Sequence, residues 1–352
     1  MNKQPVRPLE ISWFCFLFIS AVAIGTEIVA LLLILFCPAM SDTVLSTVAC
    51  YGTMLLVIAL YMLLHKRSFR DIGFRRIGAS DMLMGVFMGI LAQPAAMLIA
   101  YLSSFLFTDI VSESIDSMLS ETPLWLMIIF SAVIPAFFEE TATRGIILFG
   151  YRKSLPTWAL ILFPSLIFGV MHGNATQFLY ATALGCLFAG MALYSDSVFP
   201  SMIAHFTLNA SQMLLAAWSS GVEIPEEAAE AAAVFDIEVL GTYLLFTAAT
   251  VVPIVLCMKR LKKNREIRKR LYPQFVEAEP AVNVSENYGD VSVNENYSGV
   301  SLDWGDAPYG AAPVKAPASG KFPPAREMVP FYLALVLGAA TMVLFEIAMK
   351  MA

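Results

Sequence analysis

The sequence predicts an all-α protein, a polytopic bundle of transmembrane helices. Of its 352 residues, 58% are hydrophobic and only 14% are charged, whereas soluble domains carry about 25% charged residues. The hydrophobic residues gather in stretches of about 20, the length at which a helix crosses a bilayer. These stretches lack the alternating pattern of barrel strands, and backbone groups in lipid must be satisfied within the segment. We therefore expect helices throughout the membrane.

Nine stretches qualify as spans, which indicates about eight core helices plus one C-terminal appended helix. They are 11–37, 43–64, 82–107, 124–148, 156–173, 176–195, 198–218, 239–258 and 329–349. The first stretch is too long for the apolar region of a cleaved signal peptide, so it is interpreted as a membrane span. It contains Glu27, which we expect to be paired inside the bundle or to lie near an interface.

The charged loops predict the orientation of the chain. Basic residues follow the second span, and the segment after the eighth span, Lys259–Arg270, holds eight basic residues and one acid. The loops after the third and seventh spans carry acidic residues and no basic ones. Because cytoplasmic loops are enriched in Lys and Arg, we expect a multi-pass protein of the cell membrane with its N-terminus in the cytoplasm and its C-terminus outside.

A pair of glutamates, Glu139 and Glu140, closes the apolar run that begins at Leu124. Carboxylates inside a membrane cost roughly 2.5–3.5 kcal/mol each, so an ionisable cluster there is a functional-site hypothesis. Glu140 and Arg144 are four residues apart and share one helix face, where they can pair. Glu139 is turned from Glu140 by about 100°. It therefore stays available to face the other helices.

Two further apolar segments carry polar residues at helical spacing, His172 after Phe168 and Asn209 after His205. A desolvated glutamate such as Glu139 can act as a general base towards water, and a histidine can orient that water or return the proton. A second histidine and an amide can stabilise an oxyanion. This set could therefore hydrolyse an amide bond. Alternatively, one glutamate and two histidines could bind a metal that activates the water, although the sequence has no HExxH motif.

Together these residues resemble the three signature motifs of the CPBP intramembrane proteases. That family includes the type II CAAX prenyl endopeptidases and bacterial proteins linked to bacteriocin processing and self-immunity. The resemblance covers roughly residues 80–218, where the order and the spacing fit. Its motifs are Glu139-Glu140-x-x-x-Arg144, Phe168-x-x-x-His172 and His205-x-x-x-Asn209.

The resemblance implies a role for each motif residue. Glu139 and His172 would activate the water, and His205 and Asn209 would stabilise the oxyanion. The residues that would support the site are Glu140, Arg144 and Phe168. The family has been described both as metalloproteases and as metal-independent glutamate proteases. The sequence therefore assigns no definite cofactor, and a zinc ion held by Glu139, His172 and His205 remains an alternative.

These observations predict an organisation in four parts. Residues 1–80 hold the N-terminal transmembrane helices and a basic cytoplasmic loop, and 81–258 form the membrane-embedded catalytic bundle. Residues 259–328 are a cytoplasmic linker, first basic and then disordered, since the second part is rich in Asn, Ser, Gly and Pro. Residues 329–352 are a C-terminal transmembrane anchor outside the catalytic core.

The leading functional hypothesis is an intramembrane endopeptidase that uses a Glu/His-activated water. Its partners would be membrane-associated peptides or proteins, prenylated or not, and the lipid bilayer, with no role for nucleic acid. One alternative is a non-catalytic bacteriocin-immunity or membrane binding protein of the same fold. Another is a secondary transporter, because intramembrane charges also mark ion pathways; the internal repeats common in transporters are not visible in the helical part.

The depth of the candidate residues poses a geometric problem. At about 1.5 Å per residue, Glu139 lies about 22 Å from the outer start of its span, so we expect it in the cytoplasmic half together with His205. Counted from residue 156, His172 falls near the outer face instead. The site is expected in the cytoplasmic half, so either the fifth helix begins beyond the cytoplasmic surface of the membrane or its boundaries differ from 156–173, and Pro164 can bend it.

Overall fold

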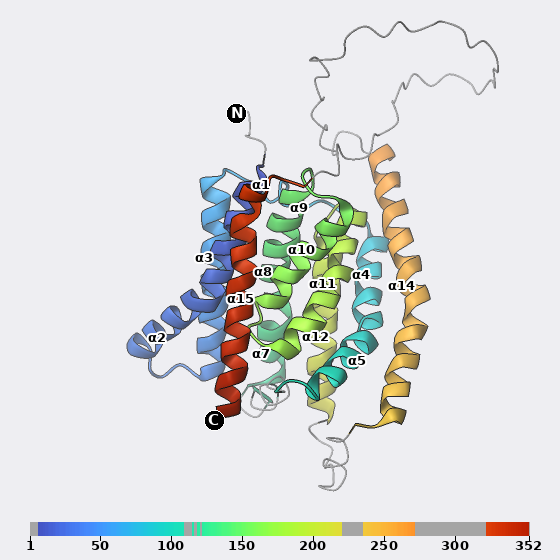
Figure 1. The fold of residues 1–352 in the computed structure, drawn as a ribbon. Helices are drawn as coiled ribbons and strands as arrows, with labels where there is room; N and C mark the ends of the chain where they lie inside the picture. Colours follow the sequence, from blue (N-terminus) through green and yellow to red (C-terminus); the bar gives the residue numbers. More distant parts are fainter. Residues whose placement is uncertain are drawn as a thin grey trace, which may run out of the picture.

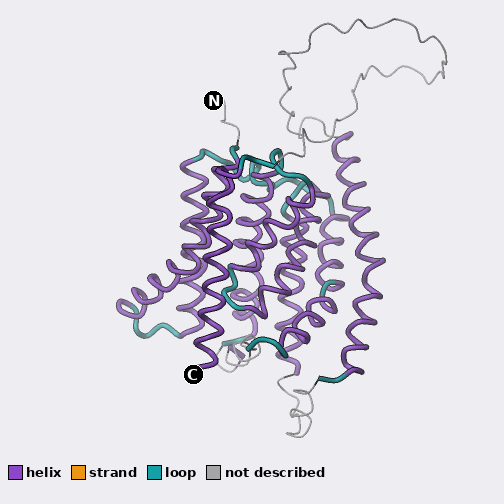
Figure 2. Tube along the Cα trace, in the orientation of Figure 1, coloured by secondary structure: helices purple, strands orange, loops and turns teal. Residues whose placement is uncertain are grey.

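The computed structural model describes residues 6–108, 115, 118–119, 122–219, 235–271 and 322–351. Within these residues, all regular secondary structure is helical (Figures 1 and 2), which confirms the all-α prediction. The elements are α1 (Pro8–Ser20), η1 (Ala21–Gly25), α2 (Thr26–Phe36), α3 (Asp42–Leu64), α4 (Ala79–Leu91), α5 (Gln93–Ser104), α7 (Leu124–Ile128), η2 (Ile129–Val133), α8 (Ile134–Glu140), η3 (Thr141–Leu148), α9 (Phe149–Tyr151), α10 (Thr157–Val170), α11 (Ala175–Ser195), α12 (Phe199–Ser219), α14 (Ile237–Leu271) and α15 (Ala325–Met351). The elements η1, η2 and η3 are π-helical.

Seven helical segments of the described chain are long and apolar enough to cross a membrane. They agree with seven of the nine predicted spans and support a polytopic bundle. The other two predictions, 156–173 and 198–218, are helices that do not qualify. α10 has only 14 residues, and the 21 residues of α12 include a polar face that turns towards the interior of the bundle. Both helices are packed among their neighbours in the centre of the bundle (Figure 1).

The central helices are covered on both sides. The most extensive contacts join α10 to α11, α12 to α4, and α1 to α15. In Figure 1, α1, α3 and α15 flank one side of the bundle, whereas α4, α5 and α14 flank the other. The C-terminal helix, expected as an appended anchor, thus packs directly against α1 and α10. Its Phe331 is almost completely buried.

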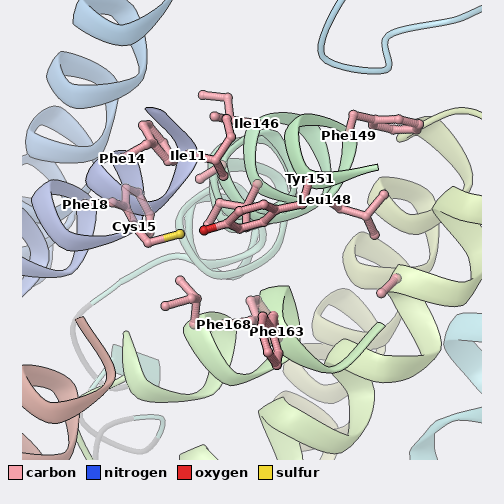
Figure 3. Packing of buried hydrophobic residues seen from close by; sticks show 14 of the residues in the cluster. Ile11, Phe14, Cys15, Phe18, Ile146, Leu148, Phe149, Tyr151, Phe163 and Phe168 are labelled. Atoms are coloured by element: carbon pink, nitrogen blue, oxygen red, sulfur yellow. The ribbon is translucent and has the colours of Figure 1, made fainter. Parts of the chain in front are cut away.

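Figure 3 shows part of the largest buried apolar cluster, which joins α1 to the span 124–151 and to α10. Ile11 and Phe18 of α1 are fully buried. Tyr151 points towards α1, where its hydroxyl shares a 2.7 Å hydrogen bond with Ser12. Because lipid tails are as apolar as these side chains, helix association in a membrane depends on close packing and interhelical hydrogen bonds.

Two glycines allow helices to approach each other closely. A Cβ atom at Gly89 of α4 would lie 2.5 Å from the carbonyl oxygen of Ala204 in α12. A Cβ atom at Gly338 of α15 would lie 2.6 Å from the Cβ of Val170 in α10. Small residues at such crossings are typical of membrane helices. The first crossing holds α12, and with it His205, against the rest of the bundle.

At the end of the bundle where α1 begins, ion pairs connect the loops between the helices. Asp196 follows α11 with a left-handed φ of 59° and accepts hydrogen bonds from Arg75, at 2.5 Å, and from Arg152. Burial alone would raise the pKa of the Asp196 carboxyl. The two guanidinium groups outweigh burial and hold that pKa below its ordinary value.

The basic segment after the eighth predicted span belongs to the same end. The sequence predicted a linker from residue 259, but α14 continues through this segment as a helix to Leu271. Arg268 and Asn264 of this segment bond to the buried carboxylate of Asp81 in α4. Residues 272–321 of the predicted linker lie outside the described residues, and its last residues, expected up to 328, already belong to α15 from Ala325. The C-terminus lies at the opposite end of the bundle (Figure 1).

Replacement of Asp196 by asparagine tests this loop cluster. Asparagine tolerates the left-handed backbone but removes the charge, so we expect D196N to lose about 1–3 kcal/mol of stability at neutral pH. Because the folded pKa is depressed, the stabilisation is present above the unfolded pKa, about 3.9, and is lost as the pH falls through the folded value. Thermal unfolding in detergent at pH 7 and pH 3 should therefore show a smaller difference from wild type at pH 3. Equal differences at both pH values would contradict the assignment.

Candidate active site

The paired glutamates lie on a short α-helix between two π-helical segments. α8 has seven residues and ends at Glu140, with η2 before it and η3 after it. Pro135 stands in the first turn of α8, and because it has no N–H it cannot continue a regular ladder of hydrogen bonds from η2. π-Helical turns are often found at functional sites. Here they set the rotation of Glu139 and Glu140 relative to the neighbouring helices.

Glu140 and Arg144 form the ion pair that their spacing predicts. Nη1 of Arg144 donates to Oε1 of Glu140 at 2.7 Å, and both side chains are fully buried. Nη2 donates to the carbonyl oxygen of Gly185 in α11 at 3.1 Å. The guanidinium lies 4.3 Å from the ring centroid of Phe168 in α10, close enough for a cation–π contact. The three residues expected to support the site are thus in contact.

His205 of α12 lies between the two glutamates. Its Nδ1 is 3.2 Å from Oε1 of Glu140, and its Nε2 is 3.8 Å from Oε2 of Glu139. Since the Glu140 carboxylate is paired with Arg144, it accepts, and Nδ1 of His205 donates. The imidazole stacks on Phe188 of α11 and meets the ring of Phe168 edge to face. These contacts hold Nε2 on the side of Glu139.

His172 lies in the turn after α10. Its Nδ1 is 2.7 Å from the carbonyl oxygen of Phe168, which can only accept, so the proton resides on Nδ1 and the lone pair on Nε2. The turn follows from the next two residues. Gly173 adopts a left-handed φ of 72°, which glycine does without steric cost, and Asn174 caps α11 by accepting from the backbone N–H of Gln177 at 2.8 Å.

Asn209 lies one turn after His205, as the spacing predicts. Its amide nitrogen donates to the carbonyl oxygen of Ser131 at 2.9 Å. Ser131 belongs to η2, where π-helical geometry displaces carbonyl groups from their regular partners. The bond therefore fixes α12 against the span that carries Glu139 and leaves the second amide hydrogen of Asn209 available.

One cavity of about 680 Å³ collects the four residues predicted to be catalytic. Glu139, His172, His205 and Asn209 all line it, together with Phe168. Glu140 and Arg144 are not among its lining residues and lie behind His205. The structure thus brings the whole predicted set together, with one group lining the cavity and the Glu140–Arg144 pair buried next to it. The roles of these residues in catalysis stay predictions.

The cavity also explains how His172 can share a site with Glu139 and His205 although their expected depths in the membrane differ. It runs from Glu139, near the middle of the bundle, to polar residues near the helix ends, namely Asp42 of α3, Gln177 of α11 and Gln212 of α12. In Figure 1 these ends lie on the side of the C-terminus. His172 lines the same cavity because α10 stops at Val170 and the following turn faces inward. The site is therefore not confined to the half expected to face the cytoplasm.

Tyr51 of α3 also belongs to the site, although no sequence motif includes it. Its hydroxyl donates to Oε1 of Glu139 at 3.0 Å. The signal that could have identified it is a polar face on an otherwise apolar span. That face consists of Thr43, Ser46, Thr47 and Tyr51, all of which line the cavity.

The donor set does not fit a metal ion in this arrangement. Within the described residues, no three side chains of His, Cys, Asp or Glu are grouped so that they could hold one. Nδ1 of His205 is engaged by Glu140 and Nδ1 of His172 by a backbone carbonyl, which leaves only Nε2 of each ring as a potential ligand. We therefore derive no step through a metal.

Fold and site together define a multi-pass membrane protein with a Glu–His cluster on the wall of an intramembrane cavity. Residues 121–211 match the family described as type II CAAX prenyl endopeptidase Rce1-like. This segment runs from α7 to α12 and contains all three motifs, so the match confirms the resemblance to the CPBP and CAAX protease family. The matched segment is shorter than the range 80–218 over which the resemblance was expected. Neither the curated proteins nor the solved structures contain a significant match.

The buried ion pair yields a prediction for stability. Replacement of Arg144 alone by leucine leaves the Glu140 carboxylate buried without its partner, which costs about 3–5 kcal/mol. We expect R144L to show a strongly lowered Tm in detergent. The double variant E140L/R144L removes both charges, and its Tm should recover most of the loss. Equal Tm values for R144L and wild type would contradict this account.

Proposed function

We propose that the protein is an intramembrane endopeptidase that hydrolyses peptide bonds in membrane-associated peptides or proteins. The observation that carries the proposal is the cavity lined by Glu139, His172, His205 and Asn209. The segment that supplies all four residues matches a family of CAAX-type endopeptidases, which implies proteolysis rather than another use of intramembrane charge.

Glu139 acts as the general base. It removes a proton from a water molecule whose oxygen bonds to the carbonyl carbon of the substrate. When the C–N bond breaks, the proton passes from Glu139 to the leaving amine. His172 orients the water, because its Nδ1–H is committed to the carbonyl of Phe168 and its Nε2 accepts a hydrogen bond from the water.

His205 and Asn209 stabilise the oxyanion of the tetrahedral intermediate. Asn209 supplies the amide hydrogen that is not bonded to Ser131. His205 donates from Nε2 while Nδ1 donates to Glu140, so this role requires the protonated ring. Donors held in place before the reaction pay no cost of reorganisation in the transition state. The buried Glu140–Arg144 pair provides this rigidity.

The orientation of the chain determines where substrates enter. The N-terminus and the basic end of α14 lie at one end of the bundle, and the polar end of the cavity lies at the other (Figure 1). By the positive-inside rule, the N-terminus is cytoplasmic and the cavity is reached from the outer side. Substrates therefore arrive from outside or from the outer leaflet.

The catalytic assignment is tested with E139Q in a cleavage assay of purified protein on labelled, membrane-associated peptides, with and without a prenyl group. Loss of the general base should reduce the rate about 10²- to 10⁴-fold. The control is E346Q, a glutamate of α15 that does not line the cavity and should leave cleavage unchanged. A chelator should not abolish wild-type activity. Unchanged cleavage by E139Q would refute the assignment.

The orientation is tested with epitope tags at the two termini. In intact cells, we expect a C-terminal tag to bind its antibody from outside, because the C-terminus lies at the end of the bundle opposite the basic, cytoplasmic end. An N-terminal tag should bind only after the membrane is permeabilised. The reverse pattern would place the cavity mouth on the cytoplasmic side.

A further inference from the structure

One wall of the cavity is formed by α3, which lies outside the matched segment 121–211. α3 packs against α8 and turns a polar face towards the cavity. The α3 residues that line the cavity are Asp42, Thr43, Ser46, Thr47 and Tyr51. Residues at these spacings lie on one side of a helix. α3 is therefore part of the site, although it lacks any of the motifs.

Tyr51 is the residue of this face that reaches the reacting group. Its hydroxyl donates to Oε1 of Glu139 at 3.0 Å, while Oε2 of Glu139 lies 3.8 Å from Nε2 of His205. The two oxygens of the carboxylate thus have different surroundings. The one bonded to Tyr51 is anchored, and the other is left to take the proton from water.

The ring of Tyr51 is itself supported. Its centroid is 6.0 Å from that of Phe138, the residue before Glu139, and its side chain is partly buried. The hydroxyl therefore approaches Glu139 from a side chain whose position is set by α8. A carboxylate of Glu has three rotatable bonds before its oxygens, and an anchored oxygen restricts the last of them.

We infer that Tyr51 is a positioning residue for Glu139, holding one carboxylate oxygen so that the other faces the water. This inference rests on the proposed function of Glu139 as the general base. It explains why α3 belongs to the site. Since small displacements of a catalytic group can cost about 100-fold in rate, the loss of one hydroxyl should be visible in turnover.

The chain offers a matched control on the same helix. Tyr61 of α3 also donates its hydroxyl to a glutamate, Glu10, at 2.7 Å. It is buried, and it lies at the opposite end of α3 from the cavity mouth. Y61F removes the same kind of bond as Y51F without touching Glu139. A purely structural effect of losing a Tyr–Glu bond should therefore appear in both variants.

The experiment compares kcat and KM of wild type, Y51F and Y61F in the peptide cleavage assay, with Tm measured for each. We expect Y51F to lower kcat about 10- to 100-fold with KM changed less than about twofold, and Y61F to keep the wild-type kcat. Wild-type kcat in Y51F, a change in KM alone, or an equal loss of kcat in Y61F would overturn the inference.

A second variant keeps the test decisive if Y51F does not fold. F138L loosens the ring that supports Tyr51 but retains the hydroxyl, so it should lower kcat less than Y51F and in the same direction; an unchanged kcat would count against the inference. The result with E139Q separates the proposed function, in which Glu139 is the general base, from the positioning role of Tyr51. If E139Q cleaves normally, the proposed function fails. If E139Q is inactive while Y51F is normal, only the role of Tyr51 fails.

Discussion

The arrangement of the central helices depends on one buried cation. Arg144 donates to Glu140 on its own span and to the carbonyl of Gly185 in α11, and its guanidinium covers the ring of Phe168 in α10. Through Glu140 the same pair engages His205 of α12. A charge without access to water must have its partners in place. Four segments of the bundle therefore share one polar contact, and their relative positions are set by it.

Helical phase gives two adjacent residues of the same type different tasks. Glu140 is enclosed by Arg144 and His205, and it has no contact with the cavity. Glu139 is rotated away from that contact and lines the cavity instead. The charge of Glu140 holds His205 in place, whereas the carboxylate of Glu139 faces the cavity.

Local spacing predicted the parts of the site that lie within one helix. The pairing of Glu140 with Arg144 and the joint placement of His205 with Asn209 follow from residues four apart. The polar face of α3 could have indicated that Tyr51 faces the interior, but not that it meets Glu139, because the contact between α3 and α8 depends on how the two helices pack. For the same reason, a linear count of depth could not show how His172 and Glu139 share a site, since it does not reveal that one cavity extends from Glu139 to the turn after α10.

The contact between α1 and α15 joins two helices that are separated by about 300 residues of sequence. Met328 and Phe331 of α15 are buried in the same cluster as Ile11 and Phe14 of α1. Thr341, further along α15, lines a small cavity next to His172. This surface is completed only when α15 has been synthesised and inserted. A nascent chain that has already produced every motif residue is thus still an unfinished bundle, and the surroundings of His172 are in place only once α15 has joined α1.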